Sequence, residues 1–118
     1  MFNMVSFLYG SYVKGEITLI VKESVNITFE RNEKTMDYYY RLTEENYGKG
    51  QAFGIEIERQ DIKDGKVINI ERDSVNMISN NEERVKNIFN LLYKNNVSPI
   101  HLLDVIGEYV DEYVGDFN

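Results

Sequence analysis

The sequence predicts an α+β fold in which a four-stranded antiparallel sheet is covered on one face by two C-terminal helices. Three observations support this prediction. Apolar and polar residues alternate over most of residues 24–73, which is typical of strands with one buried face. Turn-forming residues interrupt the alternation at 31–34, 47–50 and 64–65. Residues 79–114 then change to helical spacing.

The chain has 118 residues, a length that favours one domain with one hydrophobic core. We therefore interpret residues 1–118 as a single domain, with the sheet at 24–73 and the helix pair at 79–114. The pattern assigns no element to most of residues 1–20. Residues 17–21 are rich in β-branched side chains, so they either begin the first strand or form an additional, fifth edge strand.

The strand register follows from the parity of the apolar positions, because a shift of one residue would move every side chain to the other face. Four-residue loops at the first two turns set apolar residues of neighbouring strands opposite one another. The predicted pairs are Phe29 with Met36, Ile27 with Tyr38, Val25 with Tyr40, Leu42 with Ile55, and Tyr40 with Ile57.

The third turn is predicted from Asp64-Gly65, a pair typical of two-residue type I′ hairpins. Its register sets Ile62 opposite Val67, Ile70 opposite Arg59, Ile57 opposite Arg72, and Glu58 opposite Glu71. Ile68 and Ile70 would then share the covered face with Ile55 and Ile57. All three connections would bring the apolar sets onto one face, and this agreement supports the meander.

The first helix is expected to begin at Ser79, which forms a capping-box pattern with Glu82. Its apolar face consists of Val85, Ile88, Phe89 and Leu92. Asn95-Asn96 predicts the end of this helix, because Asn tolerates the left-handed conformation. Ser98-Pro99 predicts the start of the second helix, with Ser as the N-cap and Pro at the first position.

The second helix has two apolar sides. We expect one side to face the sheet, formed by Leu103, Ile106, Val110 and Tyr113. The other side is formed by Leu102, Val105 and Tyr109, and it requires either the first helix or a second protein as cover. Gly107 costs about 1 kcal/mol relative to Ala inside a helix. It is either tolerated or allows another backbone to approach, and a homodimer around it is the simplest version.

Composition argues against several classes of function. The chain has no cysteine, which removes disulfides, thiolate metal sites and cysteine catalysis. It has no apolar run long enough to span a membrane, and residues 1–13 lack a basic leader, so we expect a cytoplasmic protein. The net charge is −7, and no Lys or Arg follows Lys94. Although the helix pair has the outline of a helix-turn-helix, this acidity argues against direct nucleic-acid binding.

His101, Asp104 and Glu108 fall on one face of the second helix, at i, i+3 and i+7. Such a face binds a metal only with further ligands from another chain. We interpret it as a solvated polar stripe, and we predict no metal and no cofactor.

Three carboxylates, those of Glu56, Glu58 and Glu71, are expected together on the outer face of the sheet. Paired carboxylates can perform acid–base chemistry. Neutralisation by Arg41, by Lys66 or by water is the favoured interpretation.

Two segments resemble a known family. They are Phe53-Gly54-Ile55-Glu56-Ile57-Glu58-Arg59-Gln60 and Ser98-Pro99-Ile100-His101-Leu102-Leu103-Asp104-Val105-Ile106, the latter followed by Tyr109-Val110. With the strand order, they are similar to a family of small uncharacterised clostridial proteins that is known only as a domain of unknown function. The resemblance covers residues 24–113. It implies a cytoplasmic protein of a spore-forming anaerobe and supplies no activity, substrate or catalytic residue.

These observations favour a non-enzymatic protein-binding or regulatory module that docks through its acidic C-terminal helix. Tyr supplies large contact area at interfaces, and Tyr39 is expected to point outward from the sheet. The predicted partner-binding residues are Tyr39, Leu102, Val105, Glu108, Tyr109 and Glu112. The partner would be another protein or a second copy of the chain. The alternatives are an acidic inhibitor that mimics nucleic acid and a metal-dependent enzyme that uses surface carboxylates.

Overall fold

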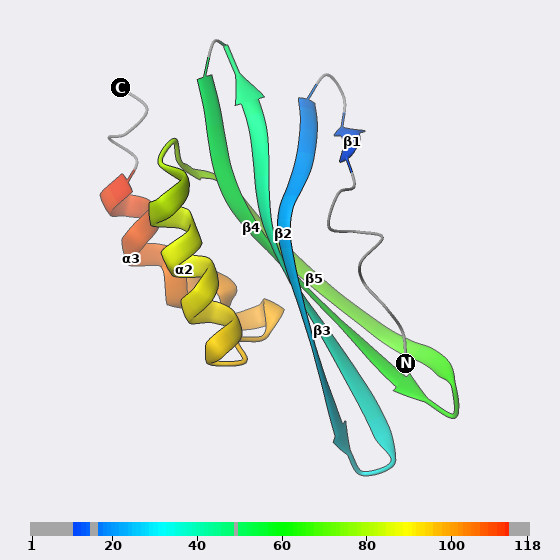
Figure 1. The fold of residues 1–118 in the computed structure, drawn as a ribbon. Helices are drawn as coiled ribbons and strands as arrows, with labels where there is room; N and C mark the ends of the chain where they lie inside the picture. Colours follow the sequence, from blue (N-terminus) through cyan, green and yellow to red (C-terminus); the bar gives the residue numbers. More distant parts are fainter. Residues whose placement is uncertain (1–10, 15–16, 49, 114–118) are drawn as a thin grey trace.

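The computed structural model describes residues 11–14, 17–48 and 50–113. The described strands are β1 (Ser11–Lys14), β2 (Ile17–Arg31), β3 (Lys34–Tyr47), β4 (Gly50–Lys63) and β5 (Lys66–Ser79). They are followed by α2 (Glu82–Lys94), the 3-10 helix η1 (Pro99–His101) and α3 (Leu102–Tyr113). The strands form one antiparallel sheet in the order β1-β2-β3-β4-β5, and the helices lie on one side of it (Figure 1). The predicted α+β architecture is confirmed, and residues 17–21 begin β2.

The hydrophobic core lies between the sheet and the helices. Apolar side chains from one face of β3 and β4 meet the apolar faces of α2 and α3 there. The Tyr40 hydroxyl donates a hydrogen bond of 2.9 Å to the carbonyl of Val97, which ties β3 to the connection after α2. The fully buried members of the core are Tyr40, Leu42, Ile55, Ile57, Val85, Phe89, Leu92, Leu102 and Ile106.

The first two strand registers are confirmed. Phe29 lies opposite Met36, and Leu42 lies opposite Ile55, as the alternation predicted. The first two turns are each shorter than expected, because Arg31 already pairs with Lys34 and Tyr47 with Gly50. The two residues of the first turn, Asn32 and Glu33, both adopt positive φ, of 52° and 65°. This is the type I′ geometry of a two-residue hairpin, and it leaves the register unchanged.

The third register is correct only next to the turn, where Ile62 lies opposite Val67. An irregularity between Asp61 and Ile62 inserts one extra residue into β5. A bulge of this kind reverses the face of every following residue. The predictions that Ile68 and Ile70 lie on the covered face, that Arg59 faces Ile70, that Ile57 faces Arg72 and that Glu58 faces Glu71 are therefore wrong. The observed pairs are Gln60 with Ile70, Arg59 with Glu71, Glu58 with Arg72, and Ile57 with Asp73.

The pairing of β4 with β5 has a second register shift at Gly54, between Phe53 and Ile55. A Cβ atom at Gly54 would lie 2.5 Å from the carbonyl oxygen of Val75 and 2.8 Å from Cα of Asn76. Only glycine permits this approach of the two backbones.

The first helix buries the predicted face, formed by Val85, Ile88, Phe89 and Leu92. It begins two residues later than expected. Asn81 is the N-cap, and its side chain accepts a 3.2 Å hydrogen bond from the backbone N–H of Arg84. Ser79 is fully buried, and its hydroxyl accepts from the N–H of Asn81 at 3.0 Å, so it positions the cap residue instead of capping the helix. The helix ends as predicted, at Asn95, and Asn96 has a φ of 54°.

The buried side of α3 differs from the prediction. Leu102 and Ile106 are fully buried, whereas Leu103 is 57% exposed. Val105 and Tyr109 are partly buried against the same core, so they lie beside Leu102 at i, i+3 and i+7. The prediction that Leu103 faces the sheet is therefore wrong. Pro99–His101 form a 3-10 turn directly before α3, and this turn sets which side of α3 faces the sheet.

Candidate functional site

A group of closely paired polar side chains lies on the outer face of the sheet, which is the face turned away from the helices. Arg41 of β3 stands opposite Glu56 of β4 and next to Glu58. Its Nη1 donates to Glu56 Oε1 at 2.7 Å and to Glu58 Oε1 at 2.9 Å. The side chains of Arg41 and Glu58 are only 8% and 5% exposed. These residues form a buried ion-pair network.

Glu58 is the centre of this network. Its Oε2 accepts a 2.7 Å hydrogen bond from Gln60 Nε2, and Arg72 Nη2 lies 3.1 Å from its Oε1. Burial would raise the pKa of Glu58, but the hydrogen bonds from Gln60 and Arg41 and the charges of Arg41 and Arg72 outweigh it, so that the pKa is lowered. Glu58 therefore stays ionised at neutral pH. A base for proton transfer at neutral pH would need a raised pKa, so the geometry favours a structural role.

The bulge in β5 separates the third predicted carboxylate from this network. Glu71 lies opposite Arg59 on the other face, 3.6 Å from Arg59 Nη1. Arg59 also binds both carboxylate oxygens of Asp61 at 3.0 Å. The hydrogen bond from Arg59 lowers the pKa of Asp61, although burial opposes this shift. Arg41 neutralises Glu56 and Glu58 as favoured above, but Glu71 does not belong to their cluster.

Tyr39 lies on the outer face as predicted, but it is only 1% exposed. The guanidinium of Arg41 lies 5.5 Å from the centre of its ring. Burial, followed by the charges of Asp37 and Glu58, raises the pKa of Tyr39 to about 12. The expectation that Tyr39 is exposed is wrong, since the polar side chains beside it are themselves buried, and its role in docking stays a prediction. These are Asp37, Arg41, Thr43, Glu45 and Glu58.

The predicted docking side of the second helix lies against the core. Leu102 is fully buried, and Val105 and Tyr109 are partly buried. Their role in partner binding stays a prediction. A Cβ atom at Gly107 would meet no atom within 4 Å, so no backbone of the described chain approaches this glycine. The side chains of Glu108 and Glu112 lie outside the described residues, and their predicted role stays a prediction.

His101 and Asp104 are both exposed, and Nδ1 of His101 lies 3.9 Å from the carboxylate of Asp104. The described residues contain no group of three or more His, Cys, Asp or Glu side chains that is arranged to hold a metal ion. Within that part of the chain, the predicted stripe has two members, and the side chain of Glu108 lies outside it.

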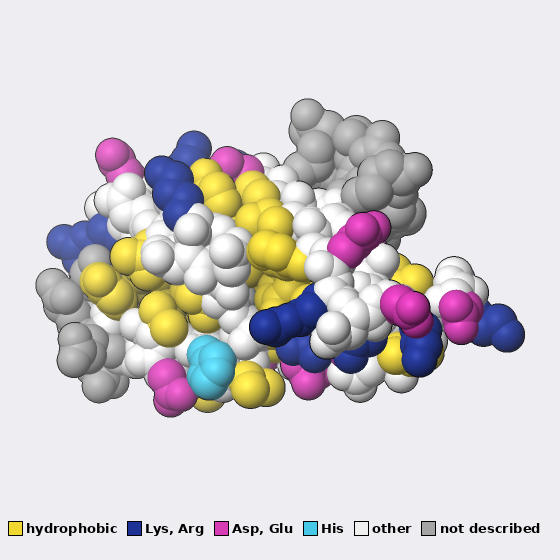
Figure 2. Space-filling view, turned by 90° about the horizontal axis from the view of Figure 1, so that it is seen from below, with side chains coloured by type: hydrophobic (Ala, Val, Ile, Leu, Met, Phe, Trp, Pro, Cys, Tyr) yellow, Lys and Arg dark blue, Asp and Glu magenta, His cyan; other side chains and the backbone are white. Residues whose placement is uncertain are grey.

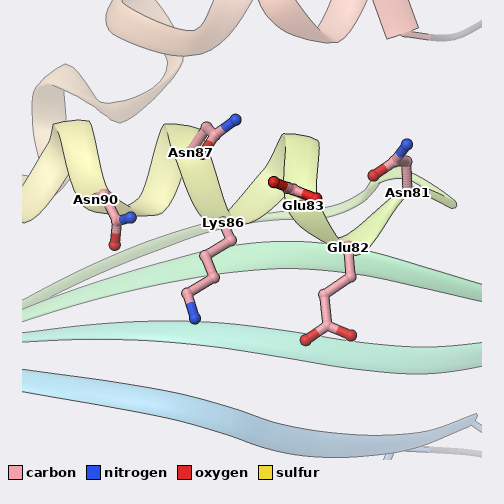
Figure 3. Close-up of a pocket in the computed structure, with 6 residues that line it drawn as sticks. All are labelled: Asn81, Glu82, Glu83, Lys86, Asn87 and Asn90. Atoms are coloured by element: carbon pink, nitrogen blue, oxygen red, sulfur yellow. The ribbon is translucent and has the colours of Figure 1, made fainter.

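An open hollow of about 630 Å³ lies at the start of α2 (Figure 3). Glu82 and Lys86 point from the helix towards the sheet, and Lys86 Nζ lies 3.4 Å from a carboxylate oxygen of Glu23 in β2. A helix N-terminus attracts anions, but Glu82 and Glu83 already supply negative charge here, and the side chain of Asn81 accepts from the backbone N–H of Arg84. We therefore interpret the hollow as the solvated start of α2 and not as an anion-binding site.

Exposed apolar side chains gather on the hairpin formed by β4 and β5. Val67, Ile68 and Ile70 are each half or more exposed, and Ile68 reaches 55%. Lys63 and Lys66 stand opposite each other at the end of the same hairpin. Neither lysine forms an ion pair with a described residue. We call Val67, Ile68 and Ile70 the hairpin patch. The bulge places Ile70 opposite Gln60, whereas a regular register would have placed it opposite Arg59.

None of the described helices has the length and apolar character needed to cross a membrane. A family model described as "Family of unknown function (DUF6514)" matches residues 18–112 of the chain. This match confirms the predicted relation to a family of unknown function. Comparison with curated proteins and with solved structures gives no match.

Proposed function

Because the chain belongs to the family of unknown function DUF6514, we propose its function from its surface, and we propose that it is a non-enzymatic protein-binding module. The hairpin patch is the observation that carries this proposal. Large apolar side chains that cluster on a surface, with a polar border, are typical of protein-binding sites. Val67, Ile68 and Ile70 cluster in this way beside Lys63 and Lys66.

The charges beside the patch indicate the chemistry of the partner. Lys63 and Lys66 face each other across the hairpin, and like charges in directly opposed positions destabilise a strand pair. A carboxylate of the partner placed between them would relieve this repulsion. We propose a protein partner with an apolar contact surface and an acidic border. The net charge of −7 disfavours an anionic membrane as the alternative occupant of the patch.

Two further features support a binding role. Arg41 holds the carboxylates of Glu56 and Glu58 in ion pairs, and the pKa of Glu58 is lowered. The two carboxylates therefore stabilise the fold and are poorly suited to proton transfer. The absence of cysteine from the sequence fits a reducing compartment, which supports a cytoplasmic setting.

The test compares two exposed residues that differ only in position. The purified wild type, Ile68→Ser and Leu103→Ser are each immobilised and exposed to nuclease-treated lysate of the source organism. Ile68 is 55% exposed in the hairpin patch, and Leu103 is 57% exposed on α3. A retained protein is then purified, and its affinity for all three forms is measured by calorimetry.

We expect the wild type and Leu103→Ser to bind this protein equally, and Ile68→Ser to bind it about tenfold or more weakly. Raising the salt concentration should weaken wild-type binding, because Lys63 and Lys66 contribute charge. Equal binding by Ile68→Ser would contradict the proposal, as would the absence of any retained protein. Loss of binding in Leu103→Ser alone would place the contact on α3, as the sequence had predicted.

A further inference from the structure

Among the described residues, no strand pairs with most of the outer edge of β2. β1 pairs with Ile17–Ile20 only, whereas the inner edge of β2 pairs without interruption with β3 from Glu23 to Arg31. No described strand lies against the outer side of residues 23–31. Figure 1 shows this half of β2 as the border of the sheet, at the opposite side from β5.

The backbone groups along this edge are free to form a ladder. Arg31 and Lys34 flank a two-residue turn, so they form a hydrogen-bonded pair, and every second residue back along β2 also directs its N–H and C=O towards β3. The N–H and C=O groups of Ser24, Asn26, Thr28 and Glu30 therefore point outward. A regular edge of this length is a template for another strand.

The opposite edge of the sheet is protected. β5 is bent by register irregularities near Gly54 and at Ile62, and Met77 has a φ of 55°. Both η1 and α3 pack against β5. Bulges and covering elements are the devices that block strand addition, and the described edge of β2 from Glu23 to Arg31 lacks them.

We infer that β2 pairs with β2 of a second copy of this chain in antiparallel orientation, with Ile27 opposite Ile27 of the partner subunit on a two-fold axis. This register sets Glu23 opposite Arg31 of the partner subunit, and the symmetry repeats the contact at the other end. Arg31 is exposed and forms no ion pair with a described residue. Glu23 lies 3.4 Å from Lys86 and is partly exposed, so it has room for a second cation.

The apolar residues agree with the same register. Val25, Ile27 and Phe29 lie on the helix-side face of β2, and each is only partly buried. The pairing sets Val25 opposite Phe29 of the partner subunit and thus forms one continuous apolar row across both copies. Figure 2 shows a band of hydrophobic side chains exposed on one face of the molecule. About eight new backbone hydrogen bonds would accompany this pairing.

Neighbouring registers fit less well. A shift of one residue would set Glu23 opposite Glu30 and Lys22 opposite Arg31, and it would turn the apolar row to the wrong face. A shift of two residues would set Phe29 opposite Glu23 and break the apolar row. The register centred on Ile27 satisfies both the charges and the apolar residues. It uses a different surface from the hairpin patch, so the two proposals stand independently.

Charge exchange tests this register with the full chain. We expect the wild type to be a dimer in sedimentation equilibrium at low salt. Arg31→Glu and Glu23→Arg should each raise the dimer dissociation constant about tenfold or more, because each opposes two pairs of like charges. An equimolar mixture of these two variants should recover the dimer, since every contact between them joins opposite charges.

Three controls make the test specific. Lys63→Glu changes the net charge as Arg31→Glu does, but it lies on another hairpin and should leave the dimer unchanged. A Lys22→Glu, Glu30→Lys double variant should also leave the dimer dissociation constant unchanged if the register is centred on Ile27. Since the chain has no cysteine, Ile27→Cys should form a disulfide-linked dimer on mild oxidation, whereas Val67→Cys should not.

A wild type that is monomeric at every concentration would overturn the inference. A dimer that tolerates Arg31→Glu, or fails to recover in the mixture, would also overturn it. If Lys22 and Glu30 prove to be the sensitive pair, the proposed register is wrong.

Discussion

Replacing Arg41 with Met should strongly destabilise this protein at neutral pH. Arg41 is the buried cation between two carboxylates, at 2.7 Å from Glu56 and 2.9 Å from Glu58. The substitution keeps the length of the side chain but leaves Glu58, which is 5% exposed, charged and without its buried partner. Breaking a buried ion pair in this way costs about 3–5 kcal/mol. For a domain of this size, the melting temperature should fall by about 12–20 °C.

Arg72→Met is the matched control. Arg72 lies 3.1 Å from the same oxygen of Glu58, but its side chain is 56% exposed. Because exposed ion pairs contribute little, this variant should lose less than about 1 kcal/mol. The two arginines thus contact one carboxylate at similar distances, and they differ mainly in burial.

The pH dependence provides a second test. In the wild type the pKa of Glu58 is lowered, so its contribution to stability is present above its usual pKa of 4.5 and is lost as the pH falls through the lowered value. Without Arg41, burial acts with less opposition and raises the pKa of Glu58. The variant then gains stability, relative to the wild type, as the pH falls, because protonation removes the buried charge. Its deficit should be smaller at acidic pH than at pH 7.

Urea unfolding of the wild type and of both variants, at neutral and acidic pH, measures these differences. A loss below about 1 kcal/mol in Arg41→Met at pH 7 would refute the reasoning. So would a deficit that does not change with pH, or equal losses in the two arginine variants.

Further substitutions test other parts of the structure. Gly54→Ala should lose about 1–3 kcal/mol in urea unfolding, because its Cβ would lie 2.5 Å from the carbonyl oxygen of Val75; an unchanged midpoint would contradict the close approach. Gly107→Ala should gain about 1 kcal/mol, since its Cβ meets no atom within 4 Å and Ala favours a helix; a loss would indicate a hidden contact. Asn81→Ala should lose about 1 kcal/mol of stability, because the helix cap is missing. Ser79→Ala removes instead the buried hydroxyl that accepts from the N–H of Asn81. In a spectrophotometric titration of the folded protein, Tyr39→Phe should remove a phenol that ionises near pH 12, and loss of a phenol titrating near pH 10 would contradict its burial.

Alternation and turn chemistry predicted most of the sheet because they depend on neighbouring residues. The registers of β2 with β3 and of β3 with β4 follow from positions such as Phe29, Met36 and Leu42. The bulge at Ile68 gave no comparable signal, because Ile-Asn-Ile alternates equally well in either phase. This one residue decided that Glu58 meets Arg72 instead of Glu71.

The candidate surfaces were predicted less well than the fold. Sequence reasoning assumed that polar positions on the second face of the sheet would be solvated, and it therefore expected Tyr39 to be exposed. In the structure these positions are buried, and Arg41 and Glu58 compensate for each other across two strands. The sequence does carry opposite charges on neighbouring strands, which could indicate such ion pairs. Which charges meet can be deduced only once the register of the strands is known.

By itself the sequence determined the α+β class, the positions of the turns, the apolar face of α2 and the end of that helix at Asn95, since each of these depends on local periodicity and backbone preference. Only the tertiary structure decided which side of α3 is buried, where Leu102 packs into the core and Leu103 stays exposed. It also decided which charges meet and which strand edge stays open. Burial and charge pairing depend on residues that are distant in the chain, and their free energies appear only when the layers assemble.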